Sequence, residues 1–176
     1  MRRTISFISF GFLALSSAVA FAQNSQPRNL ILFVPDGLRA LKVTPELAPA
    51  MAAVRDKGVN FKNPHSLFPT FTMANASGMS TGHYLGDTGT FSNSIYTGHP
   101  VQSVPSQLGT VVPFIEHDQI LGEVDKDFNG DYLNEETLLK AARDAGFSTA
   151  AIGKVGPTFL FDHTERTGTK TITVDD

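Results

Sequence analysis

The first hydrophobic pattern along the chain is an apolar run from Ile5 to Ala22, which follows two arginines. It ends in Ala20-Phe21-Ala22, the small-x-small pattern of a signal peptidase site. A membrane anchor is the alternative, but a span needs about 20 strongly apolar residues, and this run is short and contains serines. We therefore expect residues 1–22 to be a removed signal peptide, which leaves no membrane span and a periplasmic or secreted protein.

A second apolar run, Leu30–Val34, follows a polar linker over residues 23–28. A continuous run without polar alternation is typical of a strand buried on both faces of a parallel sheet. The turn residues Pro35-Asp36-Gly37 end the run. The pattern therefore places Asp36 just past the carboxyl end of the first strand.

The rest of the chain alternates between helical and strand-like patterns. A Thr44-Pro45 pair favours a helix start, Gly58 and Gly146 favour helix ends, and Asn134 is the expected N-cap of the last helix. Residues 82–107 have the composition of a loop. Expected helices cover residues 45–57, 73–82 and 135–145, and expected strands cover residues 30–34, 59–61 and 147–152. This alternation predicts an α/β fold with a layered, parallel-type sheet flanked by helices.

Charge and composition narrow the possible functions. Without residues 1–22 the chain has 154 residues, the size of one domain, and 12 basic against 17 acidic residues, a net charge of −5. This balance argues against a nucleic-acid surface. The chain has no cysteine, so an exported fold must rest on its core or on metals rather than on disulfides.

Two segments carry residues suited to catalysis. The carboxylate of Asp36 lies where open α/β sheets gather ligand-binding groups, and it could hold a cation, although Asp-Gly is also a common turn. The segment Phe68–Asn75 puts the hydroxyl of Thr72 at a helix entry and the amide of Asn75 three residues later, where both could meet an anion. A threonine becomes a nucleophile only with a base or metal, and the alternatives are a plain N-cap and a surface amide.

These segments resemble a known family in order and spacing. Asn29-Leu-Ile-Leu-Phe-Val-Pro-Asp-Gly37, Phe68-Pro-Thr-Phe-Thr-Met-Ala-Asn75, Met79-Ser-Thr-Gly82 and the loop Gly89–Tyr96 together look like the opening of type I phosphodiesterase/nucleotide pyrophosphatase proteins of the alkaline phosphatase superfamily. The match is good over residues 29–96 and loose over residues 137–157.

The resemblance implies roles for three residues. By position, Asp36 would bind a zinc ion, Thr72 would be the nucleophile and share that metal, and Asn75 would contact a phosphate oxygen. The fold would be alkaline-phosphatase-like, with residues 29–176 its N-terminal part. The substrate would be a small-molecule phosphate ester or nucleotide, hydrolysed through a phosphothreonine intermediate with two zinc ions. Met73-Ala74 stands where the family commonly has Phe-Pro.

The resemblance also implies metal ligands that are not identified in the chain. The family draws further aspartate and histidine ligands from sequence well downstream of the nucleophile. Asp162-His163 has the composition of such a pair, but it comes early and lacks the residues that usually follow. We therefore expect the sequence to stop before the remaining ligands, and the chain alone to have little hydrolase activity.

An acidic loop offers a second cation site. Asp125, Asp127, Asn129 and Gly130, followed by Glu136, fit the twelve-residue calcium-loop pattern. The alternative is an acidic surface loop that leads into the next helix.

Two other functions remain open on the sequence. One is a phosphate monoesterase of the same superfamily, because the residues that choose between monoesters and diesters are not visible. The other is a non-catalytic exported fragment that binds a cation through Asp36 or the acidic loop. A sulfatase that forms its nucleophile from cysteine is excluded, because cysteine is absent.

Overall fold

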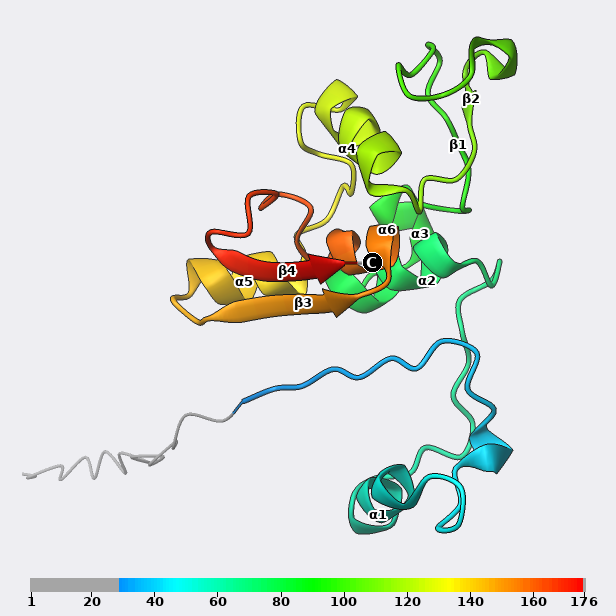
Figure 1. Ribbon diagram of the computed structural model, residues 1–176, viewed down its shortest axis with the longest axis vertical. Coiled ribbons are helices and arrows are strands. Elements are labelled where there is room, and N and C mark those ends of the chain that lie inside the picture. The colour runs from blue at the N-terminus through cyan, green and yellow to red at the C-terminus, as the bar shows by residue number, and fades with distance from the viewer. Residues whose placement is uncertain (1–28, 176) are drawn as a thin grey trace, which may run out of the picture. The chain divides into compact units, whose positions relative to one another are not determined.

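The computed structural model describes residues 29–175 and divides the chain into two compact units, one up to Asn60 and one from Phe61 onward (Figure 1). The predicted signal peptide and the linker over residues 23–28 lie outside the described residues.

The first unit begins with an extended segment that is not a strand. Leu30–Val34 makes no ladder, and its side chains are exposed, from 48% at Val34 to 84% at Ile31. The prediction of a strand buried on both faces is therefore wrong for this structure. A strand needs hydrogen-bonded neighbours, and the described elements of this unit are the helices η1 (Ala40–Lys42) and α1 (Pro49–Lys57).

Helix α1 begins later than the Thr44-Pro45 pair predicts. Its first residue is Pro49, after the N-cap Ala48, while the Thr44 hydroxyl accepts from the backbone N–H of Leu47 in a preceding turn. A helix started at residue 45 would hold Pro49 in its interior, where proline removes a backbone hydrogen bond and clashes with the preceding turn. The helix ends at Gly58 as predicted, but the strand expected over residues 59–61 is absent.

The second unit is built around helix α2 (Thr72–Thr81), which confirms the predicted helix of small residues. It ends at Gly82, whose left-handed backbone (φ 77°) favours glycine because glycine lacks a Cβ. Helix α3 (Leu85–Thr88) follows in the segment expected to be a loop. The face of α2 that carries Met73, Ala76 and Ser77 is buried.

Two small sheets replace the single layered sheet that the alternation predicts. Strands β1 (Ile95–Tyr96) and β2 (Val111–Val112) pair antiparallel, and β3 (Thr149–Gly153) and β4 (Thr171–Asp175) pair parallel. Figure 1 shows β3 and β4 side by side. The buried hydroxyls of Thr149 and Thr171, which are register partners, lie 2.7 Å apart. The mixture of helices with a parallel pair agrees with an α/β fold, although both sheets are short.

Among its described residues, the second unit contains five further helices. They are η2 (Ser106–Leu108), α4 (Asp118–Asp127), α5 (Leu138–Asp144), α6 (Val155–Phe159) and η3 (Leu160–Asp162). Helix α5 is capped by Thr137, whose hydroxyl accepts from the backbone N–H of Lys140, so the predicted Asn134 cap is wrong. Asn134 instead donates its backbone N–H to the carbonyl of Thr88.

The hydrophobic core joins α2 to α4 and α6. Its fully buried members include Met73, Val112, Ile115, Leu121 and Leu160. Within residues 29–175, no helix has the length and apolar character to cross a membrane.

Candidate functional site

Thr72 is the first residue of α2, one residue before the predicted helix start and at the helix entry where the sequence places its hydroxyl. It is half-buried, and its hydroxyl makes no hydrogen bond with any described residue. The N-cap is Phe71, whose side chain cannot accept a hydrogen bond, so the first turn of α2 has no local side-chain cap. The N–H groups of that turn therefore need partners from elsewhere.

Asn93 supplies one of these partners from 20 residues further along the chain. Its Oδ1 accepts from the backbone N–H of Met73 at 3.0 Å, and its Nδ2 donates to Oε1 of Glu116 at 3.0 Å. Asn93 is not among the predicted site residues. The available signal was its place within the loop Gly89–Tyr96, which carries part of the family resemblance.

Asn75 has a structural role in this unit. Its Oδ1 accepts from the backbone N–H of Leu67 at 2.8 Å, and its Nδ2 donates to the carbonyls of Leu67 and Phe71 at 3.3 and 3.0 Å. Both amide hydrogens are therefore used to fix the segment that leads into α2. A bond from Asn75 to a phosphate would require one of these to break, and its role as a substrate contact stays a prediction.

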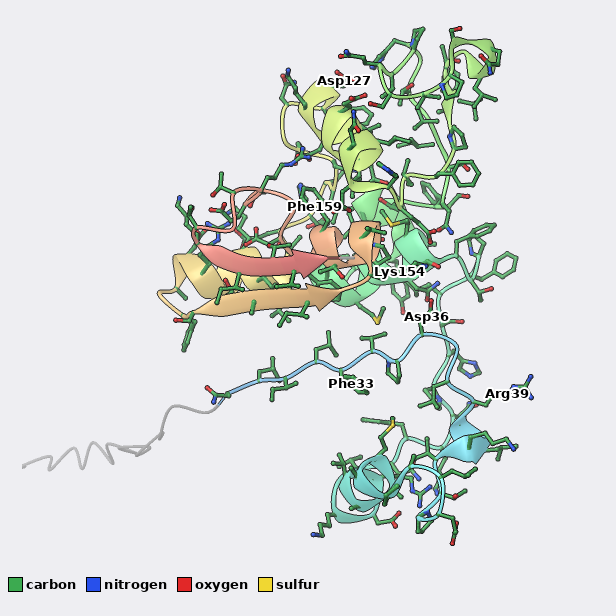
Figure 2. The ribbon with its side chains drawn as sticks, viewed as in Figure 1. Phe33, Asp36, Arg39, Asp127, Lys154 and Phe159 are labelled. Atoms are coloured by element: carbon green, nitrogen blue, oxygen red, sulfur yellow. The ribbon has the colours of Figure 1, made fainter. Side chains whose placement is uncertain are left out.

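Asp36 lies at a turn after the extended segment of the first unit, where Figure 2 shows it with Phe33 and Arg39. Its carboxylate is exposed and makes no hydrogen bond or ion pair with a described residue. Thr72 belongs to the second unit, so the shared metal remains a prediction. Across residues 29–175, no three His, Cys, Asp or Glu side chains are grouped so as to hold a metal ion.

The acidic loop does not bring its carboxylates together. Asp125 is only 4% exposed, and its Oδ1 accepts from the backbone N–H of Tyr132 and lies 2.9 Å from Nδ1 of His163. A calcium ion needs several oxygens that converge on one point. The oxygen of Asp125 instead joins the end of α4 to the segment after η3.

The other acids of the loop also have partners of their own. Asp127 pairs with His99 at 2.8 Å, and Glu136 pairs with Lys140 at 2.8 Å. Asn129 adopts a left-handed backbone (φ 59°) in the turn that follows α4. Calcium binding by these four residues stays a prediction, which the present arrangement does not favour.

Asp162 and His163 face different partners. Asp162 is buried, and its oxygens accept from Nε and Nη2 of Arg143, both at 3.1 Å, and from the hydroxyl of Thr171. Burial alone would raise the pKa of Asp162, but the hydrogen bonds from Arg143, Thr171 and Thr164 outweigh it and hold that pKa below its ordinary value. The two residues therefore hold the second unit together rather than forming a ligand pair.

A pocket of about 400 Å³ lies beside the Asn93 segment. It is lined by Gly89, Thr90, Phe91, Ser92, Ser94, Ile95, Tyr96, Ile115 and Tyr132. Two buried hydroxyl oxygens in this wall, those of Thr90 and Tyr132, make no hydrogen bond of good geometry with a described residue. Burial raises the pKa of Tyr132 to about 12, against a smaller lowering effect of the neighbouring Thr90 hydroxyl.

Comparison with known proteins gives one family. The family model described as type I phosphodiesterase / nucleotide pyrophosphatase matches residues 30–175. Neither the comparison with curated proteins nor that with solved structures gave a match. The matched range contains Asp36, Thr72 and Asn93, and it covers well over half of the chain. The chain therefore belongs to the type I phosphodiesterase/nucleotide pyrophosphatase family.

Proposed function

We propose that this chain is an exported, metal-dependent phosphohydrolase in which Thr72 is the nucleophile. The family indicates a hydrolase of the phosphodiesterase or pyrophosphatase type. The substrate would be a small-molecule phosphate ester or nucleotide, and the site of action would be the periplasm or the cell exterior.

One observation carries the proposal beyond the family. Thr72 is half-buried at the amino end of a ten-residue helix, and its hydroxyl makes no hydrogen bond with a described residue. The positive end of a helix favours the negative charge of a phosphate group. A hydroxyl without a partner is free to approach phosphorus.

The reaction would proceed in two displacements. In the first, the oxygen of Thr72 forms a bond to phosphorus while the bond from phosphorus to the leaving alcohol or phosphate breaks, and the hydroxyl proton of Thr72 ends on the oxygen of the leaving group. In the second, water attacks the phosphorus of the phosphothreonine, the bond from phosphorus to the Thr72 oxygen breaks, and one proton of that water passes to the Thr72 oxygen as the phosphate product leaves.

Zinc is proposed as the cofactor, with Asp36 and Thr72 among its ligands. Carboxylate and hydroxyl oxygens suit zinc, and two zinc ions would lower the charge on the attacking and leaving oxygens. Because zinc in proteins normally has about four ligands, the described residues supply only part of the set.

The test is made on the complete gene product, purified with zinc. Hydrolysis of p-nitrophenyl phosphate and of bis-p-nitrophenyl phosphate is measured for the wild type, Thr72→Ala and a matched control, Thr81→Ala, at the other end of α2. Zinc-dependent turnover that Thr72→Ala abolishes and Thr81→Ala retains supports the proposal. Equal turnover in the wild type and Thr72→Ala contradicts it.

The same assay separates the alternatives. Preference for the monoester indicates a phosphate monoesterase with the same nucleophile. Absence of turnover on both esters, with zinc bound, favours a non-catalytic protein that binds a cation through Asp36.

A further inference from the structure

The first turn of α2 is capped by a residue distant in the sequence rather than by the side chain of its own N-cap residue. Phe71 cannot cap it, and Oδ1 of Asn93 accepts from the N–H of Met73, the residue after Thr72. A hydrogen bond at this position fixes the backbone of the turn from which the Thr72 side chain projects. The orientation of the Asn93 amide therefore affects the placement of Thr72.

The side-chain amide of asparagine ends in a carbonyl oxygen and an NH₂ group. The two are similar in size, but the oxygen accepts hydrogen bonds and the NH₂ group donates them. If the Asn93 amide turned over, its NH₂ group would face the N–H of Met73, and two donors would oppose each other. The carboxylate of Glu116 only accepts hydrogen bonds, and its Oε1 lies 3.0 Å from Nδ2 of Asn93. Glu116 is therefore compatible with one orientation of the amide, the one that places Oδ1 on Met73.

The backbone around Glu116 is itself fixed. Its carbonyl oxygen accepts from the N–H of Gly156 at 2.6 Å, and the preceding residue, Ile115, donates its N–H to the carbonyl of Asn93 at 3.1 Å. The side chain of Glu116 is 24% exposed, so water competes with its bond to Asn93 less than at an open surface.

Lys154 has little part in this arrangement. Its ammonium lies 3.7 Å from Oε1 of Glu116, and its side chain is 50% exposed, at the start of α6 (Figure 2). Exposed ion pairs of this kind contribute little to the stability of the folded protein. Lys154 therefore offers a control that removes a neighbour of Glu116 without removing the bond to Asn93.

We propose that Glu116 is a positioning residue, which holds the Asn93 amide so that it caps the first turn of α2 and orients Thr72. The catalytic consequence rests on the function proposed above, whereas the positioning of the turn does not. The chain of contacts runs from Glu116 through Asn93 to Met73.

The first test measures the backbone directly, by amide hydrogen exchange of the chain in NMR. In Glu116→Ala the Met73 amide loses its fixed acceptor, and its exchange is expected to rise by about tenfold while the amides in the last turn of α2 keep their rates. Glu116→Gln retains an acceptor for Nδ2 and Lys154→Ala retains the carboxylate, so both are expected to stay near the wild type.

A second variant covers the case in which Glu116→Ala does not fold. Glu116→Asp keeps the charge but shortens the side chain by one methylene, so it withdraws the acceptor from Asn93 and should also raise the exchange of Met73. An unchanged Met73 rate in whichever of these two variants folds overturns the positioning role, whatever the protein hydrolyses.

The third measurement is kinetic, in the complete protein with zinc. Misplacement of a nucleophile lowers kcat, so Glu116→Ala is expected to reduce kcat by about tenfold or more, with KM changed by less than about threefold and with near-full rescue in Glu116→Gln. An unchanged kcat alongside faster Met73 exchange overturns the link to Thr72. Full activity in Thr72→Ala contradicts the proposed function alone, because the exchange result does not depend on it.

Discussion

Gly156 donates its backbone N–H to the carbonyl oxygen of Glu116 at 2.6 Å, where the start of α6 meets the segment that supports Asn93. A Cβ at residue 156 would lie 2.5 Å from both the Cα and the carbonyl oxygen of Glu116. Glycine at this position is therefore required by a close approach of two backbones, and Gly156 is also buried.

Gly156→Ala is expected to destabilise the protein by about 1 to 3 kcal/mol, because the added methyl group displaces backbone rather than a flexible side chain. Urea unfolding measures the loss. The matched control is Gly86→Ala in α3, where an added Cβ meets nothing within 4 Å, and where alanine is expected to be neutral or to stabilise by up to about 1 kcal/mol. Equal stability of both variants would contradict the close approach.

The hydroxyl of Tyr132 gives a second prediction. It is buried without a hydrogen bond of good geometry, and its residue is only 5% exposed. Burying an unpartnered hydroxyl costs about 1 to 3 kcal/mol, so Tyr132→Phe should leave the unfolding free energy unchanged or raise it by about 1 kcal/mol. A clear loss of stability in Tyr132→Phe would show instead that the neighbouring Thr90 hydroxyl is a true partner.

The pair of Arg143 and Asp162 gives a third prediction, on stability. Arg143→Leu leaves a buried carboxylate without its cation and is expected to cost about 3 to 5 kcal/mol in unfolding free energy. The matched control is Lys140→Leu on the same helix, which removes only exposed ion pairs with Glu136 and Asp144 and should cost clearly less than Arg143→Leu. Similar losses would mean that burial adds nothing to the Arg143 pair.

The same pair makes stability depend on pH. Although burial opposes it, the Arg143 and threonine hydrogen bonds hold the pKa of Asp162 in the folded protein below 3.8, its ordinary value. The contribution of Asp162 is therefore fully present above this value and is lost as the pH falls through the lower folded pKa. Unfolding free energy measured from pH 6 to pH 2 should fall less steeply in Asp162→Asn than in the wild type.

Local signals predicted α2 well, because its small residues, its start at Thr72 and its stop at Gly82 all lie within the helix or beside it. The capping of its first turn could not be predicted in the same way, since the acceptor on Asn93 comes from 20 residues away. The sequence offered Asn75 as the amide near Thr72, and the fold instead uses that amide to bind the backbone of Leu67 and Phe71. Sequence spacing identifies which polar groups are near a helix end, but tertiary contacts decide which of them face it.

Of the strand predictions, one was right and another was wrong, again because partner segments decide the outcome. β3 forms within two residues of the predicted range because its partner β4 lies in the same unit. Leu30–Val34 has the composition of a buried strand, but composition cannot supply the neighbouring strands that such a segment requires. The start of α1 was mispredicted for a local reason, since the effect of Pro49 outweighs the favourable Thr44-Pro45 pair.

The acidic loop gives the last prediction, on calcium. To turn its oxygens toward a cation, Asp125 would have to break its buried hydrogen bonds with the N–H of Tyr132 and the ring of His163. Leaving those groups unpartnered costs free energy that calcium binding would have to offset. Isothermal titration of the chain with calcium is therefore expected to show no binding in the micromolar range.

Two variants separate the outcomes of that titration. Asp125→Asn removes the charge that faces His163 and is expected to lower the unfolding free energy by at least about 1 kcal/mol, because the buried pair loses a charge-assisted hydrogen bond. Glu136→Gln affects only an exposed pair with Lys140 and should leave stability within about 1 kcal/mol of the wild type. Micromolar calcium binding that Glu136→Gln abolishes would instead mean that the loop rearranges around the ion, with Asp125 exchanging a structural role for a ligand role.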